Sequence, residues 1–493
     1  MRRSFVFVLV AVLLGGLLAA CSSSEDTLGE APLDLAARDR GQIGINVLLD
    51  GPLDRSEARA LSAYGRILDQ LDSINALTMR ASAADIAAIQ SLPFVVAANA
   101  DAERGVGPIA TTVADVLENG LSTWHLDAVD VTDGPKAPPF VSTERTLDLT
   151  GEGVFVAVID TGLMRSWASY FPVERIATEY ARSFGGGGGE RGNVSEQPNK
   201  WEHDVDAHGT HVTSTILGYS YRGAPITGVS PNVTVIPIKA LNQNGSGWSS
   251  VVARAVEDVG DLKAPGGDLE NVPVVINMSL GGSALDAVEK AAIDYAIGQG
   301  VVIVASAGNA GLSGMGYPGA YEPVVSVAAS GWVGEWQTDE ANQSVPWWIA
   351  ADVPEGVDGP DPSQFYITGF SSRERTDQDL DVAAPGSWIV GPYQINQGQL
   401  GYYYLGGTSM ASPHVAGIAA LLLEKDPTLT ASDVEKLLTE NAIPFEYASP
   451  DGTECRSVVN PFTDEYEDVC WSSHASGHGL VNTLGTLAAM DAD

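Results

Sequence analysis

Three short segments of the sequence carry side chains that could together perform nucleophilic catalysis. Asp160 directly follows the apolar run 154–159, so a buried strand would deliver a carboxylate at its carboxyl end, where α/β ligand sites cluster. His208 precedes a glycine and could enter a helix as an acid–base group near neutral pH. Ser409 lies among small residues at a predicted strand-to-helix junction, where helix amides favour developing negative charge. A carboxylate, an imidazole and a hydroxyl are what a serine nucleophile activated by a base requires.

The three segments also resemble, in order and in flanking residues, those of the subtilisin-like serine peptidases. They lie 48 and 201 residues apart, which suits one catalytic domain with an enlarged late loop. The resemblance covers about residues 124–493 and implies a serine endopeptidase that forms an acyl-enzyme on Ser409, with Asp160 and His208 completing the triad. The matching motifs are Asp160-Thr161-Gly162, His208-Gly209-Thr210-His211 and Gly407-Thr408-Ser409-Met410-Ala411-Ser412-Pro413-His414.

The same resemblance suggests the rest of the site. Asn309 ends an Ala-Ser-Ala-Gly-Asn segment that is similar to the family's oxyanion-binding segment. Two further segments are similar to the strands that bind substrate backbone, and they contain Gly245, Ser246, Gly247, Ser279, Leu280 and Gly281. The implied partners are proteins and peptides. No cofactor is implied for the chemistry, structural calcium is compatible with the family, and we expect a monomer.

Two other functions are compatible with parts of this pattern. A metallohydrolase could use His208, His211 and Asp204, although no HExxH spacing follows the histidine pair. An inactive, peptide-binding member of the family would lack a triad residue or the oxyanion asparagine, and all four are present. His211 and His414 are expected to support packing.

The elements that must position these residues fit an α/β catalytic domain over 124–493, with three layers and a mainly parallel sheet. Near-continuous Val/Ile runs separated by helical segments indicate parallel strands buried on both faces. Their ranges are 154–159, 233–239, 274–278, 301–305 and 324–327. Two stretches interrupt this rhythm and are predicted to be surface insertions: Gly185–Gly189, and 331–369 with Trp332, Trp336, Trp347 and Trp348.

Residues 41–100 are predicted to form a separate small α+β domain. The periodicity indicates a strand at 43–49, a helix at 54–64 capped by Asp54, strands within 66–80, a helix at 82–92 and a strand at 94–97. This βαββαβ order is ferredoxin-like and resembles the propeptide of subtilisin-like enzymes, which assists folding and inhibits the enzyme. Residues 101–123 are weakly patterned and are predicted to be a linker that contains the processing site.

The N-terminus predicts export. Two arginines precede the apolar run 5–20, which is typical of a signal peptide over residues 1–20. The run ends at Cys21 in a context similar to bacterial lipoproteins, so we expect a lipid on Cys21, a membrane anchor and a tether over 21–40. Ordinary cleavage with an incidental cysteine is the alternative.

The net charge and the cysteine content narrow the class of protein further. The net charge of −37, from 63 acidic and 26 basic residues, argues against nucleic-acid binding, which depends on Lys and Arg. The remaining cysteines, Cys455 and Cys470, are read as a disulfide in an exported protein, with free thiols as the alternative. That bond would close a loop of about fifteen residues and contribute ~3 kcal/mol.

Overall fold

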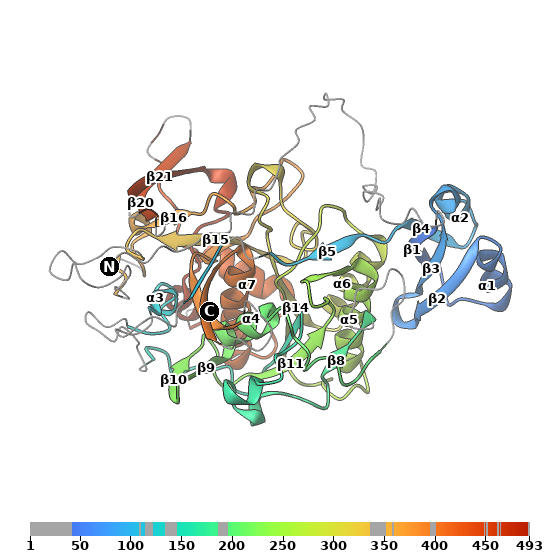
Figure 1. Cartoon of the computed structure of the whole chain (residues 1–493), viewed down its shortest axis with the longest axis horizontal. Helices are drawn as coiled ribbons and strands as arrows, with labels where there is room; N and C mark the ends of the chain where they lie inside the picture. The colour runs from blue at the N-terminus through green and yellow to red at the C-terminus, as the bar shows by residue number, and fades with distance from the viewer. Residues whose placement is uncertain are drawn as a thin grey trace, which may run out of the picture.

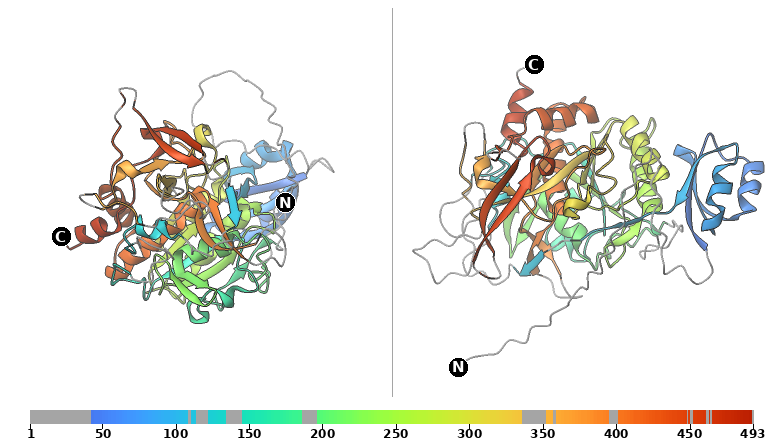
Figure 2. Two further views of the ribbon diagram at one scale, coloured as in Figure 1. Left: turned by 60° about the vertical axis from the view of Figure 1, so that its left-hand side comes forward. Right: turned by 90° about the horizontal axis from the view of Figure 1, so that it is seen from above.

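The computed structural model of the 493-residue chain contains a large body and a smaller N-terminal unit (Figure 1). The large body includes the candidate catalytic segments, and residues 42–100 form the smaller unit at one side of it (Figures 1 and 2). The structure describes residues 42–107, 110–113, 122–133, 145–185, 196–335, 352–356, 359–394, 401–447, 449, 452–460, 463 and 465–491, without the side chains of 110–113.

The body is built on an eight-stranded, mainly parallel sheet. Its strands lie in the order β16-β15-β14-β13-β7-β11-β8, with β17 paired to β15, and only β16 pairs antiparallel. The predicted parallel sheet is therefore confirmed. The bounds are β7 Phe155–Asp160, β8 Arg182–Ser183, β11 Thr234–Lys239, β13 Val274–Met278, β14 Val301–Ser306, β15 Val325–Trp332, β16 Phe365–Ile367 and β17 Val382–Pro385.

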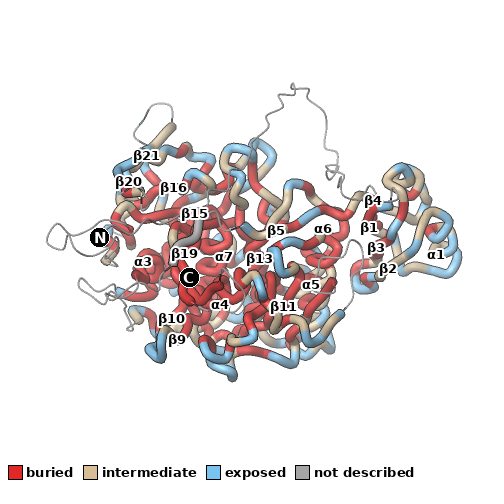
Figure 3. The backbone as a smooth tube through the Cα atoms, in the orientation of Figure 1, coloured by how far each residue is buried: buried red, intermediate tan, exposed pale blue. Residues whose placement is uncertain are grey.

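Helices cover both faces of this sheet, which gives the three predicted layers. Successive strand residues point to opposite faces, so Val156 and Val158 of β7 join one apolar core while Ala157 and Ile159 join another. Helices α4 (His208–Leu217) and α7 (Thr408–Lys425) pack in the first core. Helices α5 (Ser249–Lys263) and α6 (Ala287–Gly298) pack in the second. In Figure 3 the buried residues, drawn in red, run through the strands and helices of the large body.

Shorter elements complete the body. The helices are α3 (Trp124–Asp127), α8 (Ala431–Glu440) and α9 (Thr483–Ala489). A three-stranded sheet joins β18 (Ile389–Tyr393), β19 (Gly401–Gly406) and β6 (Ala110–Val113), and a hairpin joins β9 (Gly218–Tyr221) to β10 (Ala224–Thr227). Within the described residues, no helix is both long enough and apolar enough to cross a membrane.

The N-terminal unit is one antiparallel sheet in the order β2-β3-β1-β4 with two helices. Asp54 caps α1 by accepting from two backbone N–H groups, as its position predicts. The predicted helix at 82–92 is shorter in the structure, because a 3₁₀ turn at 83–85 precedes α2. The bounds are β1 Gln42–Leu49, α1 Arg55–Ser62, β2 Gly65–Leu71, β3 Ala76–Ser82, α2 Ile86–Gln90 and β4 Val95–Ala100.

The segment predicted to be a linker contains two strands. Strand β5 (Glu103–Gly105) pairs with β12 (Ser246–Trp248), and β6 pairs with β19. Periodicity could not reveal them, because each is three or four residues long and is held only by distant partners. In Figure 1 β5 runs from the N-terminal unit across the body.

The stretch 331–369 is not only a surface insertion. Trp332 is buried and its ring lies 6.3 Å from that of Trp124, while Phe365 to Ile367 form an edge strand of the main sheet. The burial of these large apolar side chains is favourable, and it places both ends of this stretch in the core. Trp336, Trp347 and Trp348 lie outside the described residues, as do residues 186–195 beside Gly185.

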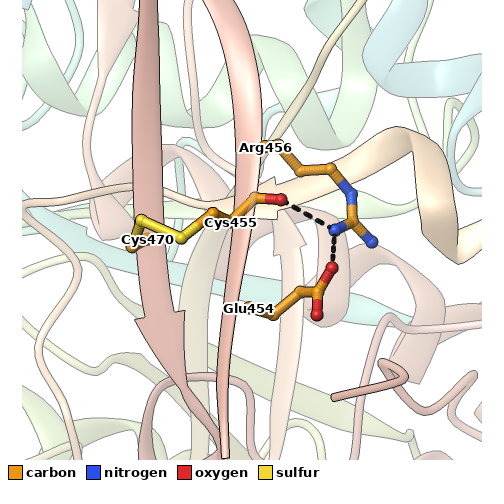
Figure 4. Close-up of a disulfide and its surroundings, with 4 residues drawn as sticks. All are labelled: Glu454, Cys455, Arg456 and Cys470. Atoms are coloured by element: carbon orange, nitrogen blue, oxygen red, sulfur yellow. Dashed lines mark hydrogen bonds and ion pairs between the residues drawn. A yellow bond between two sulfur atoms is a disulfide. The ribbon is translucent and has the colours of Figure 1, made fainter. Parts of the chain in front are cut away.

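A hairpin near the C-terminus carries the predicted disulfide. Strands β20 (Thr453–Asn460) and β21 (Glu465–Ser472) pair so that Cys455 faces Cys470, and the two sulfurs are bonded. Arg456 pairs with Glu454 and donates to the Cys455 carbonyl at 3.0 Å (Figure 4). Both cysteines are therefore structural, and the free-thiol alternative is wrong.

Candidate active site

Asp160 and His208 meet where β7 approaches α4. Asp160 ends the strand, His208 begins the helix, and both are fully buried. His208 Nδ1 lies 2.9 Å from Asp160 Oδ1 and 3.0 Å from Oδ2, so this nitrogen donates its proton to the carboxylate. The approach depends on Gly209, because a Cβ there would lie 2.5 Å from the Gly162 carbonyl oxygen.

The surrounding charges make His208 more basic. Burial lowers the pKa of its imidazole, but the charge and hydrogen bond of Asp160 outweigh burial and raise that pKa above its ordinary value. Its other nitrogen, Nε2, is buried and has no hydrogen-bond partner among the described residues. The ring is therefore oriented by one nitrogen and has the other available for proton transfer.

Ser409 is the second residue of α7, and this helix packs against α4 and β7. The three candidate residues thus come from three elements that contact one another. The Ser409 hydroxyl donates to the Ser279 carbonyl oxygen at 3.1 Å, and the Ser279 hydroxyl donates to the Ser409 carbonyl at 2.8 Å. In this rotamer Ser409 is not bonded to His208, and a turn about its Cα–Cβ bond would redirect the hydroxyl.

Asn309 follows β14 and is anchored beside the start of α7. Its Oδ1 accepts from the backbone N–H and the hydroxyl of Thr408, both at 2.9 Å. This fixes the amide so that Nδ2 points away from Thr408, and Nδ2 donates to the Gly107 carbonyl oxygen at 3.0 Å. A side-chain donor next to a serine at a helix start can stabilise an oxyanion.

Both segments predicted to bind substrate backbone contact an extended strand. Gly105 exchanges two backbone hydrogen bonds with Gly281, each 3.0 Å long, and the Val106 N–H donates to the Gly245 carbonyl at 2.8 Å. Ser246 and Gly247 face this strand in the β5–β12 pair. The strand is the chain's own segment 103–107, so the site holds an internal peptide.

The residues of the metal alternative are engaged elsewhere. His211 Nε2 lies 3.0 Å from the Ile389 carbonyl oxygen, and burial lowers the pKa of His211 to about 3. Asp204 accepts from the Thr210 hydroxyl at 2.8 Å. Across the described ranges, no three His, Cys, Asp or Glu side chains converge on a metal site.

Two residues at this cleft lie outside every motif that the sequence offers. Arg104 and Glu289 form an ion pair whose side chains are both fully buried. Neither belongs to a recognisable motif, because they lie far apart in the chain and meet only when β5 aligns with the cleft. Their one local signal is that Arg104 is the only basic residue of 101–123.

Comparisons with known proteins agree with this geometry. The model of the Subtilase family (Peptidase_S8) matches residues 151–479. Subtilisin DY of Bacillus licheniformis is 34% identical over 296 residues, which are 59% of this chain and 84% of that protein. The thermostable alkaline protease of Halalkalibacterium halodurans is 30% identical, over 62% of this chain and 66% of its own.

A solved structure has the same fold over most of the chain. Fervidolysin from Fervidobacterium pennivorans, a keratinolytic enzyme related to subtilisin, aligns with a TM-score of 0.60 at 24% identity. The alignment covers 91% of this chain and 61% of fervidolysin. The family match, the fold and the arrangement of acid, base and serine agree, and the chain belongs to the subtilase family of serine-type endopeptidases.

Proposed function

We propose that the enzyme cleaves proteins through an acyl-enzyme on Ser409 and matures by cutting its own N-terminal segment. The observation that carries this proposal is the internal peptide in the cleft. The Gly107 carbonyl oxygen lies 3.0 Å from Asn309 Nδ2, and both residues line the same cavity as Ser409. A carbonyl so held is where a scissile carbonyl would lie.

The chemistry follows from the roles of the side chains. His208 Nε2 takes the hydroxyl proton as Ser409 Oγ attacks the carbonyl carbon, and Asp160 stabilises the resulting imidazolium. Asn309 Nδ2 and the Ser409 backbone N–H stabilise the oxyanion. His208 then protonates the leaving nitrogen, the C–N bond breaks, and the acyl group remains on Ser409. Water, deprotonated by His208, hydrolyses that ester and restores the serine.

Residues 42–107 act as the inhibitory propeptide in this proposal. Asp101 accepts from the Ser250 N–H at 3.0 Å and its hydroxyl at 2.7 Å, at the start of α5. Asn99 Oδ1 accepts from the Ala287 N–H at the start of α6. Helix N-termini favour such acceptors, so these contacts would hold the segment on the enzyme while 103–107 fills the cleft. The bond cut in maturation would be that between Gly107 and Pro108.

Export and anchoring are part of the same proposal, although residues 1–41 lie outside the described residues. The signal over 1–20 and a lipid on Cys21 would bring the protein through a membrane and retain it there. Metabolic labelling with a tagged fatty acid tests this: wild type should carry the label and Cys21→Ala should not. Label of equal strength in both proteins would contradict the anchor.

A serine-directed fluorophosphonate tests the proposed chemistry. Peptide mapping after labelling should place the added mass on Ser409, and proteolysis of casein should stop in proportion to labelling. Activity that survives complete labelling but is lost with a chelator would favour the metallohydrolase instead. Loss of activity with chelator alone would not, because a structural cation gives the same result.

A further inference from the structure

The register of the internal peptide identifies one enclosed side-chain subsite in the cleft. Backbone hydrogen bonds to Gly281 and Gly245 fix residues 105 and 106, and Asn309 fixes the carbonyl of 107. Side chains alternate along an extended strand. Any substrate bound in this register therefore directs its fourth residue before the scissile bond to the position that Arg104 occupies.

Every arm of the Arg104 guanidinium has a partner there. Nε donates to Glu289 Oε1 at 2.9 Å, and Nη2 donates to Glu289 Oε2. Nη2 also donates to the Ala284 carbonyl at 3.0 Å, and Nη1 donates to the Glu103 carbonyl at 2.9 Å. The planar, two-pronged contact with a carboxylate matches arginine better than lysine, whose ammonium is a point charge.

The enzyme supplies a space suited to this side chain. Gly282 lines it, and a Cβ at that position would lie 2.7 Å from Arg104 Nη1 and 2.1 Å from the Glu103 carbonyl oxygen. Glu289 lies in the first turn of α6 next to Asp286, so the enzyme's side of the subsite is acidic. Burial raises the pKa of Glu289, and the permanent charge of Arg104 opposes that rise.

The position next to the scissile bond makes no comparable contact. Gly107 has no side chain, and beside it lies a cavity of about 870 Å³ whose lining includes Leu280, Gly308, Met315 and Gly316. The internal peptide thus leaves this space unfilled and makes its charged, fully enclosed contact through Arg104. When the peptide leaves, Glu289 loses the positive charge of Arg104. A buried carboxylate without a cationic partner is costly, so the empty subsite favours another cation.

We propose that Glu289, the Ala284 carbonyl and Gly282 form an acidic subsite that selects arginine at the fourth position before the cut, in the propeptide and in protein substrates. This inference rests on the proposed peptide cleavage at Ser409. It adds a substrate class to that activity: extended segments with an arginine three residues before the residue whose carbonyl is attacked.

The test uses two quenched fluorescent peptides that differ in one atom group. One carries the sequence of residues 101–112 and the other has citrulline, the neutral isostere of arginine, in place of Arg104. For the mature wild-type enzyme we expect kcat/KM to be about 100-fold higher for the arginine peptide than for the citrulline peptide. An effect of this size is typical when one partner of a buried ion pair is removed. In Glu289→Gln the ratio should fall to about threefold or less.

Asp294→Asn is the matched control, since it removes one negative charge from the exposed face of the same helix. It should keep the wild-type ratio. A wild-type ratio near one overturns the acidic subsite without any variant, and so does a Glu289→Gln enzyme that retains the full ratio. If Glu289→Gln does not fold, Glu289→Asp replaces it, and its ratio should fall below that of wild type because the shorter carboxylate cannot span the guanidinium.

Casein separates this inference from the proposed function. Wild type that cleaves casein but treats both peptides alike contradicts only the acidic subsite. Wild type that cleaves neither casein nor peptide contradicts the proposed function. The subsite is then tested by fluorescence anisotropy with labelled versions of the two peptides, where equal affinities would overturn it and at least tenfold tighter binding of the arginine peptide would support it.

Discussion

In the proposed mechanism, one task is divided among the side chains of Ser409, His208 and Asp160. A serine hydroxyl is a weak nucleophile at neutral pH and needs a base within reach. His208 can serve because Asp160 accepts a hydrogen bond from its Nδ1–H, while Nε2 has no hydrogen-bond partner among the described residues. The three candidate residues could be named from sequence, because each lies in a short motif. The rotamer of Ser409 could not, since it depends on the Ser279 carbonyl.

Activity should depend on pH through His208. The neutral imidazole accepts the proton, so kcat/KM should fall as pH drops through the His208 pKa. Asp160 raises that pKa against the effect of burial, so the fall should begin above the ordinary histidine value of about 6.5. A pH–rate profile with a short peptide checks this, and a profile that is flat from about pH 5 to 9 would contradict it.

Asn309 should matter in the transition state and much less in substrate binding. Asn309→Ala removes the amide donor that lies 3.0 Å from the Gly107 carbonyl oxygen. We expect kcat to fall about 10²–10³-fold with little change in KM, which is the effect known for the corresponding donor in subtilisin. Steady-state kinetics on one peptide separate the two constants. A rise in KM with unchanged kcat would mean that Asn309 helps to bind the substrate but does not stabilise the transition state.

At the scale of elements, the site depends on how closely α4 approaches β7. Gly209→Ala should push the helix away, since the new Cβ would lie 2.5 Å from the Gly162 carbonyl oxygen and 3.2 Å from the Asp160 Cβ. We expect kcat to fall at least tenfold (about 1.4 kcal/mol), because catalytic geometry tolerates little displacement.

Gly298→Ala is the matched control for that substitution. It lies in α6, where an added Cβ meets nothing within 4 Å, and alanine in a helix stabilises by about 0.5–1 kcal/mol relative to glycine. Its kcat should equal that of wild type while its thermal midpoint rises. Equal activity of Gly209→Ala and Gly298→Ala would show that the α4–β7 spacing does not control catalysis.

The C-terminal hairpin should contribute stability and not chemistry. Replacing Cys455 and Cys470 by serine opens a loop whose ends are fifteen residues apart, which should lower the free energy of unfolding by about 3 kcal/mol. Thermal melts of the double variant and of reduced wild type should agree, while peptide kinetics at 25 °C stay unchanged. Melts that match oxidised wild type would contradict a stabilising role.

At the scale of the whole molecule, sequence predicts local elements better than distant pairings. The Val/Ile runs are strands of the main sheet. The periodic segments of 42–100 are the strands and helices of the N-terminal unit. Residues 103–105 were missed because a three-residue strand has no periodicity and gains its order from β12 and Gly281. Glu289 was missed for the same reason: its role depends on a partner 185 residues away.

The arrangement of the two units makes self-cleavage the step that frees the cleft in the proposed maturation. Residues 42–107 lie against α5 and α6 and enter the cleft in one continuous segment. Cleavage after Gly107 would separate the inhibitor from the enzyme, and the lipid proposed on Cys21 would then remain with the removed segment. The catalytic unit should therefore leave the membrane when the propeptide dissociates.

The proposed role of Ser409 in self-cleavage is tested by intact mass spectrometry of wild type and Ser409→Ala, both expressed with the N-terminal segment, together with a casein assay. Ser473→Ala, at an exposed position, is the matched control. We expect wild type and Ser473→Ala to lose the residues up to Gly107 and to cleave casein, while Ser409→Ala keeps that segment and is inert. If Ser409→Ala is processed and active like wild type, Ser409 is not the nucleophile and the proposed mechanism is wrong.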